Sequence, residues 1–309
     1  MSHVRDVAVL GAGVIGASWA ALFLAAGCRV AIFDPAQGTE QAVRKYIDGA
    51  WLTLDELGLI KTRTRDQLSF CNTATEAVKG ADFIQESVPE RLQLKHELYA
   101  VIEPALKDGA VVATSASGLR LSEMQAGWHD PSRFVLGHPF NPPHLIPLVE
   151  VMGNDRTAPG VIDSAEHFYR SLGKVTIRVN REVPGHIANR LQAALWREAI
   201  HLVAIGAASV EDIDTAVWAG PGLRWAAMGP TMLFHLGAGE GGLAAFCERY
   251  TESFHRWWDD LGSVKLRPDI VASLIAGVNA EARASTRDEL CAGRDELVVA
   301  FLKAANRLR

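Results

Sequence analysis

The sequence predicts an α/β protein with two domains: a doubly wound, mostly parallel sheet domain followed by an all-helical domain. In the first half of the chain, short apolar runs alternate with helix-length segments, as buried parallel strands and their connecting helices do. From Pro184 onward only helical patterns follow. A length of 309 residues also exceeds what one compact core usually holds. We therefore expect a sheet domain at residues 1–182 and a helical domain at residues 183–309.

The expected strands are short, rich in β-branched residues and bounded by glycine or polar residues. They cover residues 7–10, 30–33, 83–85, 111–114, 134–136, 148–152 and 175–179. Apolar residues at three-to-four spacing predict a helix over residues 92–106 and a long one over residues 187–205. Ser209 precedes Asp212 by three residues and is expected to cap the next helix.

Composition excludes several classes of function. The net charge is -5 and no Lys/Arg-rich run offsets it, so we expect no nucleic-acid partner. The 4 cysteines form no Cys-x-x-Cys pair, which indicates a reduced chain with no metal site. The longest apolar stretch, residues 19–28, is about half the length of a membrane span, and the start does not resemble a secretion signal. We expect a cytoplasmic protein with no membrane contact.

A strand over residues 7–10 runs directly into Gly11-Ala-Gly13-Val-Ile-Gly16 and then a helix. In this context the spacing is the dinucleotide-binding fingerprint of Rossmann domains. The first glycine permits the tight turn, the second lets a pyrophosphate approach the backbone, and the third lets the helix pack on the sheet. The N-terminus of the helix then offers free N–H groups to the phosphates.

The second strand ends at Asp34, about 20 residues after the first glycine, where an acid accepts hydrogen bonds from the adenosine ribose. A carboxylate there repels a 2′-phosphate, and the next residues supply no arginine to neutralise one. The sequence therefore predicts NAD rather than NADP as cofactor. The residues expected to contact it are Gly11, Gly13, Val14, Ile15, Gly16, Asp34 and Glu90.

His138 and Glu150 are the candidate catalytic pair. His138 follows a strand-like run, and Glu150 lies within an apolar one. A carboxylate in such a strand needs a partner, because burying it unpaired is costly. A nearby histidine would serve, and a His–Glu pair is a general base whose tautomer is fixed.

These motifs resemble the 3-hydroxyacyl-CoA dehydrogenase superfamily over essentially the whole chain. That family carries a strand-end Ser, a His before Phe-Asn-Pro, a Glu twelve residues later, and an Asn in a Pro-Gly-Phe-Ile-x-Asn-Arg segment. The resemblance places these on Ser117, His138, Glu150 and Asn189. It implies that His138 removes the hydroxyl proton, that Glu150 orients it, and that Ser117 and Asn189 bind the substrate oxygen or position His138.

Two segments depart from the pattern of the acyl-CoA enzymes. Ser115-Ala-Ser117-Gly stands where they usually read Asn-Thr-Ser-Ser, although Ser117 is retained. After Pro142, the pair Pro143-His144 falls where those enzymes vary. We expect His144 to be a surface loop residue rather than a substrate contact.

The second domain resembles the branch of the superfamily that acts on small free hydroxy acids, the carnitine and gulonate dehydrogenases with the lambda-crystallins. Gly220-Pro-Gly-Leu-Arg224-Trp225 carries an Arg–aromatic pair that the acyl-CoA enzymes lack. Arg224 is the candidate fork for a substrate carboxylate. Trp196, two helical turns after Asn189, and Trp225 are candidate walls for a quaternary ammonium group, with helical core as the alternative.

Local resemblance orders the expected substrates. The segments 85–91 and 194–199 and the pair Trp257-Trp258 resemble the carnitine enzymes, whereas Met228-Gly-Pro230 and residues 246–250 resemble the gulonate and crystallin branch. We expect NAD-dependent oxidation of L-carnitine to 3-dehydrocarnitine first, L-gulonate second and a 3-hydroxyacyl-CoA third. A structural, crystallin-like protein is the non-enzymatic alternative. The resemblance also implies a homodimer formed through the second domain.

Overall fold

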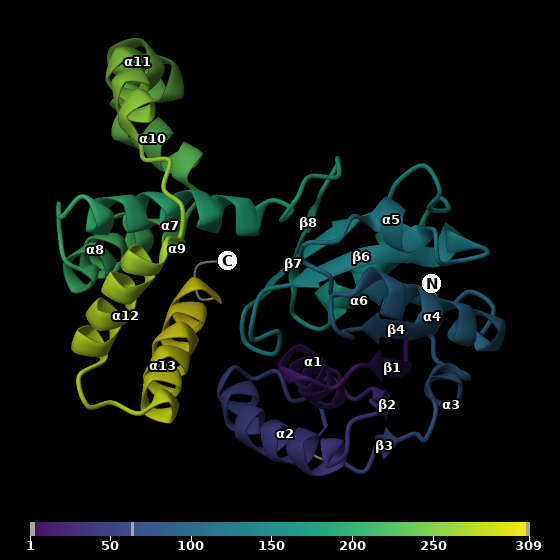
Figure 1. Ribbon diagram of the computed structural model, residues 1–309. Helices are drawn as coiled ribbons and strands as arrows, with labels where there is room; N and C mark the ends of the chain where they lie inside the picture. The colour runs from purple at the N-terminus through teal and green to yellow at the C-terminus, as the bar shows by residue number, and fades with distance from the viewer. Residues whose placement is uncertain (1–3, 63–64, 307–309) are drawn as a thin grey trace. The chain divides into compact units, whose positions relative to one another are not determined.

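The predicted α/β fold is confirmed in a computed structural model, which describes residues 4–62 and 65–306. Residues 1–3, 63–64 and 307–309, which include the outer ends of both expected domains, lie outside the described residues. The chain divides into two units, Met1–Arg190 and Leu191–Arg309. The first contains an 8-stranded sheet with helices on both faces, and the described part of the second is helical (Figure 1).

The sheet has the strand order β3-β2-β1-β4-β5-β6-β7-β8. Its strands are β1 (Asp6–Leu10), β2 (Arg29–Phe33), β3 (Leu68–Phe70), β4 (Phe83–Glu86), β5 (Val111–Thr114), β6 (Phe134–Pro139), β7 (Leu148–Met152) and β8 (Val175–Arg178). The strand order reverses between β1 and β4, because β2 and β3 lie on one side of β1 and the later strands lie on the other. In doubly wound sheets a ligand binds at such a switch point, beyond the carboxyl ends of the strands.

All neighbouring strands are parallel except β6 and β7, which form an antiparallel pair. In the register of this pair, His138 stands directly opposite Glu150. Side chains opposite each other in an antiparallel pair point to the same face of the sheet. The twelve-residue separation of the two residues is therefore the length of a hairpin that brings them together.

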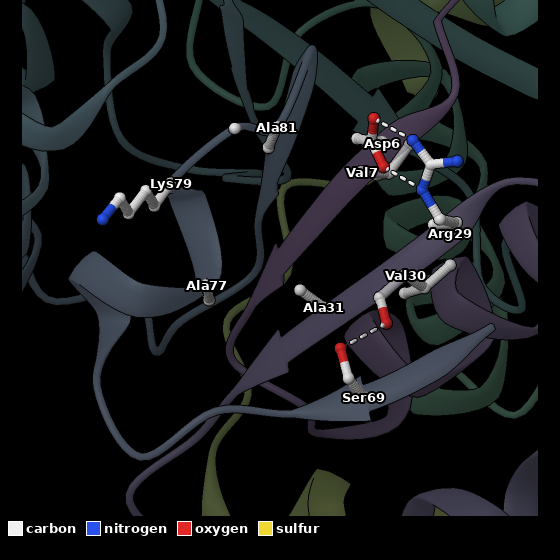
Figure 2. A pocket seen from close by; sticks show the side chains of 10 residues that line it. Asp6, Val7, Arg29, Val30, Ala31, Ser69, Ala77, Lys79 and Ala81 are labelled. Carbon is white, nitrogen blue, oxygen red and sulfur yellow. Dashed lines mark hydrogen bonds and ion pairs between the residues drawn. The ribbon is translucent and has the colours of Figure 1, made fainter.

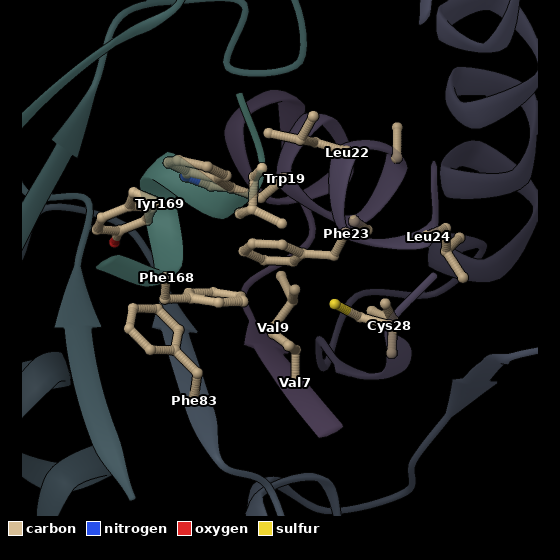
Figure 3. Packing of buried hydrophobic residues seen from close by; sticks show 14 of the residues in the cluster. Val7, Val9, Trp19, Leu22, Phe23, Leu24, Cys28, Phe83, Phe168 and Tyr169 are labelled. Carbon is tan, nitrogen blue, oxygen red and sulfur yellow. The ribbon is translucent and has the colours of Figure 1, made fainter. Parts of the chain in front are cut away.

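Helices cover both faces of the sheet. One face carries α1 (Val14–Ala25), α2 (Thr39–Glu56) and α6 (Val161–Ser171), and the other carries α3 (Ala74–Val78), α4 (Leu92–Ile102) and α5 (Leu121–Gln125). Figure 3 shows the first core, in which Trp19 and Phe23 of α1 pack with Phe168 and Tyr169 of α6. Trp19 stacks on Phe23 with ring centroids 5.4 Å apart. This packing fixes α1, and with it the turn at its N-terminus, against the sheet.

Besides shifts of one residue at several ends, three differences from the sequence-based expectation stand out. The predicted helix over 92–106 ends at Ile102 and continues as a 3₁₀ turn, Glu103–Ala105, because Pro104 cannot continue an α-helix. The three-residue edge strand β3 was not predicted, since its alternation is too short to recognise. Strand β6 continues to Pro139, so His138 lies within the strand rather than after it.

The second unit is built from helix pairs. Its helices are α7 (Ala188–Ala204, which begins in the first unit), α8 (Val210–Val217), α9 (Leu223–Ala227), α10 (Pro230–Gly237), α11 (Gly242–Asp260), α12 (Pro268–Ala282) and α13 (Arg287–Asn306). The expected cap of α8 is confirmed, because the Ser209 hydroxyl accepts the Asp212 N–H at 3.1 Å. Gly277 lets α12 approach α8, since a Cβ there would lie 2.3 Å from Val210. Over the described ranges no helix combines the length and apolar composition that crossing a membrane requires.

Candidate active site

The glycine-rich turn between β1 and α1 leaves open space at one position only. Gly11 has φ +84°, and a Cβ on it would lie 2.7 Å from the carbonyl group of Ser87. A Cβ on Gly16 would lie 1.9 Å from the Gly11 oxygen. Around Gly13, by contrast, nothing lies within 4 Å of such an atom. The outer glycines are thus required by the fold, whereas Gly13 leaves room for a ligand to reach the backbone.

The surroundings of Gly13 fit a dinucleotide. Helix α1 begins at Val14, and none of the described side chains caps its N-terminus, so its first N–H groups are available to a phosphate. Val14 and Ile15 form the first turn. Asp34 follows β2 and lies beside this turn, where its carboxylate accepts the N–H groups of Ala12 at 2.7 Å and Ala36 at 2.9 Å. An uncapped helix end that donates, an open glycine and a strand-end acid that accepts are the features that bind NAD in such domains.

His138 and Glu150 form a buried hydrogen-bonded pair. Nδ1 of His138 lies 2.8 Å from Oε2 of Glu150, and the two residues are 5% and 0% exposed. Because a carboxylate accepts, Nδ1 carries the hydrogen and Nε2 carries the lone pair. Nε2 forms no hydrogen bond with any described residue, so it is available to take a proton.

The second oxygen of Glu150 holds the start of helix α7. Oε1 accepts the N–H groups of Ile187 at 2.9 Å and Ala188 at 3.0 Å. Burial alone would raise the pKa of Glu150, but the hydrogen bonds from His138 and these two amides hold it below its ordinary value. Asn189 follows immediately in the first turn of α7, and its side chain bonds to none of the described residues. One carboxylate therefore orients the base and holds the start of the helix that carries Asn189.

Ser117 lies in the loop after β5, and its hydroxyl is bound by Glu90. Oε2 of Glu90 accepts this hydroxyl at 2.9 Å, while Oε1 accepts the N–H groups of Ser117 at 2.8 Å, Leu119 at 3.0 Å and Gly118. Burial would raise the pKa of Glu90, but these hydrogen bonds keep it below its ordinary value. Ser117 thus donates to Glu90 rather than to His138, and it can offer a ligand only lone pairs. The sequence did not reveal that Glu90 holds this loop.

A buried ion pair fixes the segment that carries Glu90. Glu86 ends β4, is 0% exposed, and accepts from Lys95 at 2.5 Å and from Tyr99 and Thr114, each at 2.8 Å. Its Oε1 also accepts the Val88 N–H at 2.8 Å. Every oxygen of this buried carboxylate is therefore satisfied, as burial of a charge requires. Sequence patterns did not identify the cluster, because its members come from three separate elements.

His186 is a further residue that the sequence analysis missed. It stands where the family segment Pro-Gly-Phe-Ile-x-Asn-Arg has Phe, and this difference could have identified it. Its ring is buried, with its centroid 5.2 Å from that of His138. Its backbone has φ 52°, a region that non-glycine residues rarely occupy. The active-site wall therefore contains a second imidazole.

His144 is a correction, because it is buried rather than a surface loop residue. It is 5% exposed, and its Nδ1 lies 2.9 Å from the hydroxyl of Ser18 on α1. The same hydroxyl accepts the His144 N–H at 2.8 Å. These two hydrogen bonds hold the loop between β6 and β7 against α1.

The expected substrate-binding residues belong to the second unit. Trp196 lies on α7, and Arg224 and Trp225 lie on α9. Trp196 is 56% exposed and Trp225 is 40% exposed, so neither fills the core of its unit. Arg224 forms no ion pair with the described residues of that unit, which leaves its guanidinium free for an anion.

A separate pocket lies at the end of the strands opposite to the glycine-rich turn. Figure 2 shows it at the amino ends of β1 and β2, where Asp6 pairs with Arg29, with Ser69 of β3 and Lys79 also lining it. The glycine-rich turn and Asp34 follow the carboxyl ends of the same strands, so this pocket is not part of the candidate active site. No group of three or more His, Cys, Asp or Glu among the described residues is arranged to hold a metal ion.

Family models and relatives of known name match this chain over most of its length. The family model "3-hydroxyacyl-CoA dehydrogenase, NAD binding domain" matches residues 6–183, and "3-hydroxyacyl-CoA dehydrogenase, C-terminal domain" matches residues 185–265. An L-carnitine dehydrogenase of Streptomyces coelicolor is 47% identical over 99% of this chain and 96% of its own. One from Pseudomonas putida is 41% identical over 98% and 95%.

A solved structure is similar over almost the whole length. It is 5-formyl-3-hydroxy-2-methylpyridine 4-carboxylic acid 5-dehydrogenase, described as an NAD+ dependent dismutase. The TM-score is 0.85 at 29% identity, covering 98% of this chain and 99% of that one.

Proposed function

Because the chain belongs to the 3-hydroxyacyl-CoA dehydrogenase family, we propose that it oxidises the 3-hydroxyl of L-carnitine to 3-dehydrocarnitine. It is an NAD-dependent oxidoreductase that acts on a CH–OH group. The observation that carries the proposal is the His138–Glu150 pair, buried and in cross-strand register on the sheet that also carries the dinucleotide turn. The choice of carnitine is supported by relatives of that name that match along the full chain.

The proposed acid–base step uses both nitrogens of His138. Nε2, which bonds to none of the described residues, takes the proton of the substrate hydroxyl as the carbinol C–H bond breaks. Nδ1 stays bonded to Glu150, so the positive charge that develops on the ring lies 2.8 Å from a carboxylate. Asn189 and the lone pairs of Ser117 are proposed to bind the substrate oxygen. NAD supplies the hydride acceptor when it is bound.

The residues proposed to hold NAD are those that the sequence analysis named. The N–H groups at Gly13, Val14 and Ile15 would receive the pyrophosphate, between the turn glycines Gly11 and Gly16. The Asp34 carboxylate would accept the ribose hydroxyls in exchange for the Ala12 N–H that it binds here. Glu90 would contribute to NAD binding by holding the loop that carries Ser117.

The proposed division of roles follows the two domains expected from the sequence. Residues 1–182 would hold NAD and the base, and residues 183–309 would supply substrate contacts and a homodimer interface. Arg224 would bind the carboxylate of carnitine, and Trp196 and Trp225 would face its trimethylammonium group. The free thiols of all 4 cysteines fit a reducing compartment, and we propose that the enzyme acts in the cytoplasm.

The test measures NADH formation by the purified full-length chain with NAD and L-carnitine, L-gulonate or (S)-3-hydroxybutyryl-CoA. A clear preference in kcat/KM for L-carnitine is expected. Preference for either other substrate would refute the carnitine assignment, and no turnover of any of them would refute the assignment to this group of substrates.

A second arm tests the base. His138→Gln should lose at least about a thousandfold in kcat while NADH still binds, because the proton acceptor is gone. The exposed His167 on α6 provides a matched control, and His167→Gln should keep parent activity. An active His138→Gln variant would refute the role of His138.

A further inference from the structure

We infer that His186 is a positioning residue of this active site: its neutral ring stabilises the protonated form of His138 that the oxidation produces. The inference rests on the proposed role of His138 as the base. It starts from the contact between the two rings, whose centroids are 5.2 Å apart and whose planes are tilted by 54°. His186 is 2% exposed, so bulk water does not screen this contact.

The hydrogen bonds of His186 determine its tautomer. Nε2 lies 3.1 Å from the carbonyl oxygen of Ala116, which can only accept, so Nε2 carries the hydrogen and Nδ1 carries the lone pair. Nδ1 is buried and forms no hydrogen bond with any residue that the structure describes. The other buried unpartnered side-chain atoms among the described residues can all donate: those of Trp19, Gln125, Trp128 and Thr176. His186 therefore supplies the one atom of that set that is purely an acceptor.

Burial, rather than the surrounding charges, is the main reason that the ring of His186 stays neutral. Burial lowers the pKa of His186, the bond to Ala116 raises it, and repulsion by a protonated His138 lowers it again. Glu150 and Glu90 act in the opposite direction. Glu150 holds Nδ1 of His138 directly, so a positive charge on that ring has a carboxylate partner, whereas the hydrogen bond of His186 goes to a neutral carbonyl.

An unpaired acceptor beside the base stabilises the protonated form of His138 more than its neutral form. With His138 neutral, the Nδ1 lone pair of His186 has no favourable partner. When His138 becomes an imidazolium, the same lone pair belongs to a buried ring that lies next to a cation. Interactions that strengthen only as charge develops accelerate the chemical step.

Backbone strain at this residue points the same way. Of the described non-glycine residues, only His186 and Arg283 have positive φ. Arg283 is exposed at the end of α12, whereas His186 is buried against the base. Strained backbone persists where surrounding structure holds it, and it gathers at functional sites. The strain and the unpaired nitrogen thus fall on one residue, next to His138.

The test compares three variants of the full-length enzyme. His186→Phe keeps a ring but removes the nitrogens, and His186→Asn keeps a side-chain acceptor on a residue that tolerates positive φ. His186→Gly also removes the nitrogens and relieves the backbone, so it serves if the Phe variant fails to fold. His167→Phe, at an exposed position on α6, is the matched control.

The kinetic readout is the pH profile of kcat with NAD and L-carnitine. The Phe and Gly variants should lose about fivefold to tenfold in kcat. The acid limb of their profiles should move to lower pH, because protonated His138 has lost a stabilising neighbour. The KM for NAD should stay unchanged, and the Asn variant should fall between these variants and the parent. Profiles of the Phe and Gly variants that superimpose on that of the parent would overturn the inference.

A second readout does not depend on turnover. Histidine NMR titration of the unliganded protein, with the His138 signal assigned by its absence in His138→Gln, reports the protonation of His138 directly. A shift to lower pH in the Phe or Gly variant supports the inference even if L-carnitine is not the substrate, in which case only the proposed function fails. Unshifted titration curves overturn the inference even if carnitine is oxidised.

Discussion

Replacing Glu150 by Gln tests the central pair most directly, because the two oxygens of this carboxylate do different work. Oε2 holds Nδ1 of His138, and Oε1 holds the Ile187 and Ala188 amides at the start of α7. Glutamine has nearly the same size, but it has only one acceptor oxygen and brings an N–H₂ group that cannot accept the His138 hydrogen. The variant can keep the helix contact only by losing the histidine contact, or the reverse.

The expected loss of activity is large and the loss of stability moderate. Without its carboxylate partner, His138 loses its fixed tautomer and the stabilisation of its cation, a change that costs about 10³ to 10⁴ in kcat where it has been isolated in other histidine bases. If the amide oxygen turns to the helix, the two N–H bonds become neutral ones, and stability falls by about 1–3 kcal/mol. Activity should therefore fall far more than folding does.

The assay pairs NADH formation with urea unfolding of the same preparations. Glu166 provides the matched control, since it is 2% exposed on α6 and pairs with Arg178 at 2.7 Å and Arg170 at 3.2 Å, away from the His138–Glu150 pair. Glu166→Gln should lose comparable stability and keep activity. This comparison separates the role of Glu150 in the reaction from its role as a buried charge.

The pH dependence gives an independent check. The pKa of Glu150 is lowered in the folded state, so its contribution to stability is present above its ordinary value of 4.5 and is lost as pH falls through the folded value. The stability difference between the parent and Glu150→Gln should therefore shrink in acid. A Glu150→Gln variant within tenfold of parent activity would refute the reasoning, as would equal losses of activity in both Gln variants.

Three further predictions concern the glycine turn, Asp34 and Lys174. Gly11→Ala should lower the unfolding free energy by more than about 2 kcal/mol, because Gly11 has a positive φ and backbone is packed against it. Gly13→Ala should instead fold normally and bind NADH more weakly. Denaturation would check the first result and fluorescence titration with NADH the second. Asp34→Ala should raise the KM for NAD roughly tenfold to a hundredfold, from the loss of charge-assisted hydrogen bonds; an unchanged KM would remove Asp34 from the site. Burial lowers the pKa of Lys174 from 10.5 to about 7, so the unfolded chain binds more protons between these values and stability should rise with pH across them. Urea unfolding of Lys174→Met should show that this rise is absent.

The sequence by itself determined the parts of the site that depend on neighbours close along the chain. The strand, the glycine turn, the helix and the strand-end acid form one continuous unit, so their spacing was enough to predict NAD. The twelve-residue separation of His138 and Glu150 is likewise local, because it is spanned by one hairpin. The fold class followed from the same short-range alternation of strands and helices.

Only the tertiary structure decided what depends on contacts between distant segments. Glu90 holds a loop 27 residues away, and Glu150 holds the start of a helix 37 residues away. The His186 imidazole donates to a carbonyl 70 residues away, and this hydrogen bond sets its tautomer. Its Nδ1 is left buried, without a hydrogen bond to any described residue. Periodicity records which face of an element is buried, but it does not record what that face meets. These partners are set by the order of strands in the sheet, and so the packing of the first unit, rather than any local pattern, surrounds His138 with the groups that tune it.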